Sequence, residues 1–230
     1  MNTIRETVIQ NLITQLKYIK STYGYNNTFA DAKIIRGRNQ IHESELPAIL
    51  VIPGLENIEK RYSEAVHDMP VEIKAYREFT SSQNPSVLGE TLLGDLIINV
   101  FNPIYELDFT LGDHEISEGN TITGKISGAT SIVTDVTING GSWATANAYG
   151  TLKLRYQDGN YQSELIQVSG IDSATIAGDS DRIYPYGTAV GQVIYDQAGI
   201  DISPDPGEKI IEVVLNIRMQ YTTAFDNPYV

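Results

Sequence analysis

The chain has 230 residues, of which 41% are hydrophobic, so it is long enough for one large globular domain or two small ones. It contains no cysteine, which excludes disulfides and thiolate metal sites. The formal net charge of -13 opposes tight binding to nucleic acid, because that binding depends on lysine and arginine displacing counterions. The same acidic balance is compatible with a surface that DNA slides past without being held.

The first segment predicts an amphipathic helix over residues 3–21. Apolar side chains recur there at helical spacing, and polar ones lie largely off that stripe. Polar residues also interrupt the N-terminal apolar stretch, so we expect no secretory signal. The apolar runs elsewhere are far shorter than the ~20 residues of a membrane span, so no membrane partner is expected. The helical stripe consists of Ile4, Val8, Leu12, Leu16 and Ile19.

A short buried strand is predicted over 48–52, closed by a turn at Pro53-Gly54. Two strand-like runs follow, over 58–66 and 71–79. In the second run apolar and charged residues alternate, which is typical of a strand with one solvated face. These patterns predict a hairpin whose turn is the segment 67–70.

The next two elements are a helix and a long strand. Asn84 followed by Pro85 is a helix N-cap with proline at the first helical position, and the predicted helix continues to Phe101. It is apolar on most of its circumference, so it must be buried. The segment 209–221 alternates apolar and polar residues throughout and would span about 43 Å as a strand. That length exceeds what a small domain needs, so part of the strand could pair with another chain.

Residues 107–206 differ in composition from both ends of the chain. They hold 13 of the 19 glycines, and their apolar runs are short and β-like. Asn139-Gly140 and Asp158-Gly159 are hairpin turn signals. We therefore expect an α+β host formed by 1–106 plus 207–230, into which an all-β, barrel-like domain of 107–206 is inserted. The predicted β runs of the insert are 121–126, 131–138, 151–156, 164–168 and 189–195.

Few residues suggest catalysis or metal binding. His42, His67 and His114 are isolated and lack metal-ligand spacing, and neither Asp113-His114-Glu115 nor Asp179-Ser180-Asp181 completes a ligand set. No nucleophile elbow, phosphate loop or dinucleotide fingerprint occurs. Asp158 with Glu164 is one of many carboxylate pairs that could be drawn for glycoside cleavage. We predict no catalytic residue, no metal and no cofactor.

The predicted insert is rich in aromatic residues, which β modules use both for core packing and for stacking on sugars or proteins. Core packing is the favoured interpretation. If the domain does recognise a ligand, Trp143 and Tyr161 are the candidate residues.

The two ends of the chain together resemble the tail terminator proteins of long-tailed bacteriophages. The resemblance lies in the order of elements: an amphipathic helix, the buried strand ELPAILVIPG (45–54), the charged hairpin 57–79, a helix and a long closing strand. That strand runs into the tyrosine-rich end YTTAFDNPYV (221–230). The resemblance implies an α/β sandwich with an antiparallel or mixed sheet and two helices. Its candidate interface residues are Met219, Tyr221, Asn227, Pro228 and Tyr229.

Residues 112–170 resemble a small β module that recurs in phage tail and fibre proteins. The module has a T-G-x-x-S-G-A core, then a G-x-L-x-L strand, then a G-x-(Y/F)-x-x-E hairpin. Most tail terminators lack such an insertion, so its role is not implied by the family. The matching residues are Thr123, Gly124, Ser127, Gly128, Ala129, Gly150, Leu152, Leu154, Gly159, Tyr161 and Glu164.

The resemblance implies a structural virion protein rather than an enzyme. Such proteins form a ring, typically a hexamer, at the head-proximal end of the tail, and are assembled in the host cytoplasm. The implied partners are further copies of the chain, the tail tube protein and a neck or connector protein, with the sheath protein as a further candidate and DNA passing through without specific binding. Alternatives are another ring of the neck, a saccharide or host-surface binding module on an α/β scaffold, and a glycosidase.

Overall fold

The computed structural model describes residues 2–38, 40–183, 185–186, 190–202, 209–224, 227 and 229. Its fold class is α+β, with two helices, a mixed sheet and a separate antiparallel sheet. The chain divides into two compact units. The larger unit comprises residues 1–20, 25–101 and 185–230, and the inserted unit comprises residues 21–24 and 102–184.

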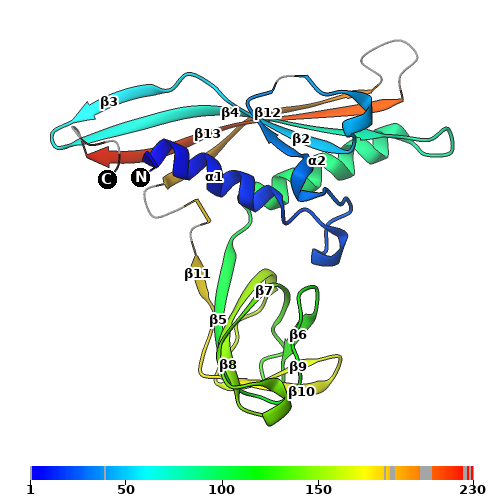
Figure 1. Ribbon diagram of the computed structural model, residues 1–230, viewed down its shortest axis with the longest axis vertical. Helices are drawn as coiled ribbons and strands as arrows, with labels where there is room; N and C mark the ends of the chain where they lie inside the picture. The colour runs from blue at the N-terminus through cyan, green and yellow to red at the C-terminus, as the bar shows by residue number, and fades with distance from the viewer. Residues whose placement is uncertain are drawn as a thin grey trace. The chain divides into compact units, whose positions relative to one another are not determined.

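The sheet of the larger unit is built around two long strands. Strands β4 and β13 pair antiparallel over all fifteen residues of each. On one side β13 also pairs with β12, and on the other side β4 pairs first with β3 and then with β2, which pairs in parallel with β1 (Figure 1). The strands are β1 (Ile34–Arg36), β2 (Ala48–Pro53), β3 (Asn57–Arg61), β4 (Glu64–Glu78), β12 (Val190–Ile202) and β13 (Ile210–Ala224).

Strand β13 has the alternation that its sequence predicts. Its odd-numbered residues from Ile211 to Thr223 are buried, and its even-numbered residues from Glu212 to Gln220 are partly exposed. The buried residues face the helices, because Gly89 of α2 lies against Ile211. We refer to this side of the sheet as the helix face and to the other side as the open face.

Both helices begin as the sequence predicts. In α1 (Ile4–Leu16) the Thr3 hydroxyl accepts from the Glu6 amide at 3.2 Å, and in α2 (Pro85–Phe101) the Asn84 side chain accepts from the Ser86 amide at 3.1 Å. Helix α1 ends five residues earlier than the predicted Ser21. At this end the backbone amides of Tyr18 and Ile19 donate to the carbonyls of the residues three positions earlier, Gln15 and Leu16. The Ile19 carbonyl accepts from the Phe29 amide.

The predicted hairpin turn at 67–70 is wrong. The turn is at Tyr62-Ser63, and β4 continues through His67 to Pro70. Pro70 lies where the neighbour of β4 changes from β3 to β2, so its missing N–H leaves no ladder partner unsatisfied. The Gly54 amide donates to the Pro70 carbonyl at 2.8 Å at this junction.

The inserted unit is an antiparallel sheet whose strand pairing returns on itself. Strand β5 pairs with β8 and also, over two residues, with β10 (Figure 1). Since the closing pair is so short, the hydrogen bonding is ring-like rather than that of a regular barrel. The strands are β5 (Ile104–Gly112), β6 (Thr121–Gly124), β7 (Thr130–Gly140), β8 (Ala148–Asp158), β9 (Glu164–Val168), β10 (Ile171–Ile176) and β11 (Asp181–Ile183).

The unit boundaries differ from the predicted 107–206. Of the run predicted at 189–195, residues 190–195 belong to β12, which pairs with β13 in the larger unit and not with the insert, and residue 189 lies outside the described residues. Residues 21–24 belong to the inserted unit, where the Tyr23 hydroxyl donates to Glu118 at 2.5 Å. The chain leaves the larger unit after Phe101 and returns to it at Pro185, and these two points are close together. The Tyr186 hydroxyl donates to the Val100 carbonyl at 2.8 Å.

Candidate functional site

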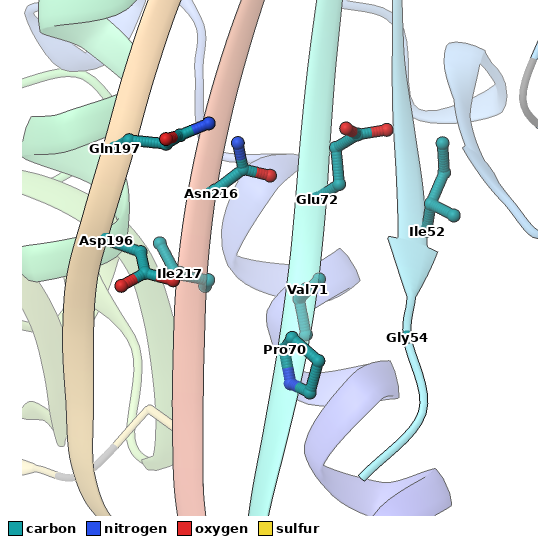
Figure 2. A pocket seen from close by; sticks show the side chains of 9 residues that line it. All are labelled: Ile52, Gly54, Pro70, Val71, Glu72, Asp196, Gln197, Asn216 and Ile217. Atoms are coloured by element: carbon teal, nitrogen blue, oxygen red, sulfur yellow. The ribbon is translucent and has the colours of Figure 1, made fainter.

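One end of the open face of the larger sheet is covered by a small apolar cluster. There Ile41 and Leu46, from the segment before β2, pack on a small cluster of Leu50, Tyr76 and Ile210. Further along the sheet lies a hollow of about 480 Å³, which Figure 2 shows with α1 behind the strands. Its lining consists of Ile52, Gly54, Pro70, Val71, Glu72, Asp196, Gln197, Asn216 and Ile217.

The hollow is polar, and its carboxylates are paired with cations. Glu72 lies 3.3 Å from the Lys74 ammonium, and Asp196 lies 3.5 Å from the Arg218 guanidinium. Asp196 is the extra residue of a β-bulge, because Tyr195 pairs with Ile217 and Gln197 pairs with Asn216. Both carboxylates of the hollow are therefore engaged by cations of the same sheet.

A second ion-paired group lies beside the hollow on the open face. Lys74 is 3.4 Å from Glu212, and Arg218 is 3.3 Å from Asp68. Burial alone would lower the pKa of Lys74, but the carboxylates of Glu212 and Glu72 outweigh it and raise that pKa. Burial, reinforced by Glu212, raises the pKa of the Tyr76 hydroxyl. The face therefore presents a fixed pattern of charge in which carboxylates outnumber cations.

The sequence-predicted interface residues Met219 and Tyr221 are in the core of the larger unit. Both point to the helix face, and they are 0% and 1% exposed. The Tyr221 ring stacks on His67 at 4.7 Å between centroids, and its hydroxyl donates to Glu56 at 2.6 Å. Burial, together with Glu56, raises the pKa of Tyr221. In the folded chain neither side chain is free to form an interface.

The other three interface candidates lie at the C-terminal end. Asn227 is half-buried, and its amide donates to the Ala224 carbonyl at 3.2 Å. Tyr229 is 48% exposed, so it is accessible to a partner. Pro228 lies outside the described residues.

Among the described residues, the sheet of the larger unit has strands with a single neighbour on both of its sides. Strand β12 pairs with β13 alone, and β3 pairs with β4 alone, in the part of the chain that the structure describes. All five residues of β3 are exposed. By composition β12 was predicted to belong to the insert, so this edge was not predicted. One signal for it was present in the sequence: no lysine, arginine or proline occurs between 190 and 202.

The candidate recognition aromatics of the insert are packing residues. Tyr161 is 3% exposed. Trp143 is partly buried, stacks on Phe109 at 5.1 Å between ring centroids, and occupies the space that a Cβ on Gly112 would need. The favoured core interpretation thus fits both residues: Tyr161 is enclosed, and one face of the Trp143 ring is taken up by Phe109.

Glu164 holds together the turn of the insert that contains Ser127. Its carboxylate accepts from the amides of Ile126 at 2.5 Å and Ser127 at 2.9 Å, and from the Ser127 hydroxyl at 2.6 Å. Burial opposes its ionisation, but the hydrogen bonds from Ser127, Ile126 and Gln162 prevail and lower the pKa of Glu164. A Cβ on Gly124 would meet the same carboxylate at 2.6 Å. One hydrogen-bonded turn thus contains three of the motif residues, Gly124, Ser127 and Glu164. Because its carboxylate is fully engaged in that turn, Glu164 is not available as half of a catalytic pair.

The remaining sequence candidates do not converge on a site. The three histidines lie apart: His42 caps a short turn, His67 is stacked in the larger unit, and His114 is exposed in the insert. Asp179 accepts from the amides of Tyr161 and Ser180, as in a polar turn. Among the described residues, no group of acidic and histidine side chains is arranged to hold a metal ion. Over the same residues, neither helix has both the length and the apolar character needed to cross a membrane.

Comparison with known proteins adds no assignment to these surfaces. No family model matches the sequence, and no curated protein is detectably similar to it.

Proposed function

We propose that this chain is a structural subunit of a phage tail, which forms a ring at the head-proximal end of the tail tube, ends tube growth and joins the tail to the neck. The observation that carries the proposal is the position of β13. This strand lies in the centre of the larger sheet, between β4 and β12, so the two ends of the chain close into one α+β unit with an insert between them. That is the organisation the tail terminator resemblance implies.

Two further features support a ring subunit. The larger unit has its helices on one face of the sheet and leaves free strand edges on both sides, which suits head-to-tail association of identical copies. On the open face of its sheet, Lys74 and Arg218 are held in ion pairs, and the net charge of -13 per chain disfavours retention of DNA in a channel.

A ring of the neck, one level nearer the head, would use the same architecture and is the second candidate. The two differ in their partners, because a terminator binds the end of the tail tube and a neck ring binds the connector. The saccharide-binding alternative is weakened by the packing of Tyr161 and Trp143 inside the insert.

We expect the purified full-length chain to form a ring-shaped oligomer, with a hexamer of six 25.4 kDa chains as the expected species. Light scattering gives the mass, and negative-stain electron microscopy gives the shape. A sample that stays monomeric at every concentration, and also when mixed with tail tubes, would contradict the proposal.

A further inference from the structure

Strand β12 has a regular edge that nothing on the strand itself protects. Its pairing with β13 has register shifts near Gly191 and at Asp196, but from Gln197 to Ile202 it runs without interruption. Proteins commonly protect such edges with lysine, proline or a bulge. The stretch from Gln197 to Ile202 has none of these, and its only charge is Asp201.

The opposite side of the sheet offers a strand of matching length. The five residues of β3 are exposed, and Ile58 is 54% exposed although it is apolar. The other strand on this side, β1, has three residues, and its Arg36 is bound to Glu6 at 2.6 Å. Of the two, β3 is the accessible one.

Strand direction decides how two copies would join. Strand β12 is antiparallel to β13, β13 to β4, and β4 to β3, so β3 runs antiparallel to β12. If a second copy continues the sheet with the same strand direction and the same face, its β3 therefore meets β12 antiparallel. This joint repeats the type of pairing already present in the sheet.

The side-chain faces of the two strands fix the register. Ile58 and Lys60 pair with His67 and Ala65, which lie on the helix face, so Asn57, Glu59 and Arg61 lie on the open face. On β12, Ala198 and Ile200 lie on the helix face, and Gln197, Gly199 and Asp201 lie on the open face. Within the regular stretch one register aligns all five residues of β3 by face: Asn57 opposite Asp201, Ile58 opposite Ile200, Glu59 opposite Gly199, Lys60 opposite Ala198 and Arg61 opposite Gln197.

The backbone directions agree with this register. Pro70 is on the open face, and its carbonyl accepts from Gly54 on the β2 side, so open-face residues of β4 direct their backbone groups toward β2 and β3. Backbone N–H and C=O groups alternate in direction along antiparallel strands. They therefore point away from their own sheet at Ile58 and Lys60 on β3 and at Ala198 and Ile200 on β12. These are the residues that the register places opposite each other.

Charge favours this joint over a two-fold dimer. The five residues of β3 carry two cations, Lys60 and Arg61, against one carboxylate, Glu59, which is paired with Arg61. The joint would place them along a strand whose only charges are Asp196 and Asp201. Pairing β12 with β12 of a second copy would instead bring two strands together that carry acidic residues and no cation of their own. Of these acidic residues only Asp196 is ion-paired within the described part of the chain, with Arg218 of the neighbouring β13.

We propose that β3 of one copy pairs antiparallel with residues 197–201 of β12 in the next copy, with Ile58 opposite Ile200, so that the sheet continues from subunit to subunit. The inference rests on the proposed ring and names its subunit joint. Each copy is displaced along the strands relative to the last, and a closed ring takes up that displacement by strand tilt, as a barrel does.

The test uses a disulfide, which is clean because the chain has no cysteine of its own. Glu59→Cys and Gly199→Cys are introduced together, since both positions lie on the open face and a Cβ at Gly199 meets nothing within 4 Å. Within one chain the two thiols cannot meet: Glu59 lies in line with Thr222 and Gly199 with Val214, about 26 Å apart along β13. After mild oxidation, we expect most of the monomer band to be lost to a ladder of covalent oligomers on a non-reducing gel.

The matched control combines Glu59→Cys with Gly191→Cys, which lies on the same strand with equally free space but outside the register. It should stay monomeric on the gel, as should each single variant. A ladder from the control, or a dimer from Gly199→Cys alone, would overturn the proposed joint. So would rings seen by microscopy that do not cross-link although both thiols react with a maleimide; that result would leave the proposed ring in place. Absence of both rings and cross-links would overturn the ring proposal as well.

Discussion

Met219→Ala is expected to lower the free energy of unfolding of the larger unit by about 2–5 kcal/mol, whether or not the protein is assembled. The side chain is fully buried on β13, opposite Met69 on β4 and Val193 on β12. Its truncation leaves a cavity between strands that are held on both sides and have little room to close it. The measurement is hydrogen exchange of the β13 amides, followed through a urea titration.

The control is Tyr229→Ala, at a position that the same sequence pattern nominates as interface but that is 48% exposed. It should change the stability by less than about 0.5 kcal/mol. If Met219→Ala left the exchange of β13 unchanged and altered only the oligomeric state, Met219 would be an interface residue and its burial within one chain would be wrong.

Glu164→Ala is expected to lower the free energy of unfolding of the inserted unit by about 3 kcal/mol. The substitution removes a buried carboxylate that accepts from three backbone amides, of Ile126, Ser127 and Gln162, and from the Ser127 hydroxyl. Hydrogen bonds to charged groups contribute roughly 1.5–3 kcal/mol each without being additive. The single tryptophan of the chain, Trp143, lies in this unit, so its fluorescence reports the unfolding of the insert. Glu115→Gln, an exposed carboxylate in the same unit, is the matched control.

The same carboxylate predicts a pH dependence. Folding lowers the pKa of Glu164 below its ordinary value of 4.5, so the ionised form stabilises the insert above that pH. The contribution is lost as the pH falls below 4.5 through the folded-state pKa. Glu164→Gln should therefore lose less stability between pH 6 and pH 3 than the wild type does. An equal loss in both proteins would show that the ionisation of Glu164 does not contribute to the pH dependence of the stability of the insert.

Periodicity predicted the elements whose burial is set within one segment. Helix α2 begins and ends where its N-cap and apolar pattern place it, and the alternation of β13 is observed along its whole length. A two-residue period or a 3.6-residue period is visible without knowledge of the partner.

The features that the sequence did not predict are those that depend on which strands lie side by side in the sheet. Pro70 in the middle of an alternating run indicated a turn, so β4 was divided into two short strands. Without its fifteen-residue partner, β13 looked too long for its own domain. The interface candidates Met219 and Tyr221 came from the family resemblance, and the folded chain alone already buries both side chains.

Strand β12 was assigned to the insert for a related reason. Its glycines and small polar residues match the composition of the insert, and only the pairing with β13 reveals that it belongs to the larger sheet. The hydrogen bond between Ser127 and Glu164 likewise could not be predicted, because it joins residues that are far apart in the sequence. Its components were nevertheless present as matches to the β module.

The most direct test of the proposed function is a tube-capping assay. Purified full-length protein is added to tail tube protein during polymerisation, and tube lengths and ends are examined by electron microscopy. The account predicts that growth stops and that a ring is seen at one end of each tube, with no such arrest from the Met219→Ala variant under conditions that unfold its larger unit. Tubes that grow to the same lengths with and without the protein, and carry no ring, would contradict it.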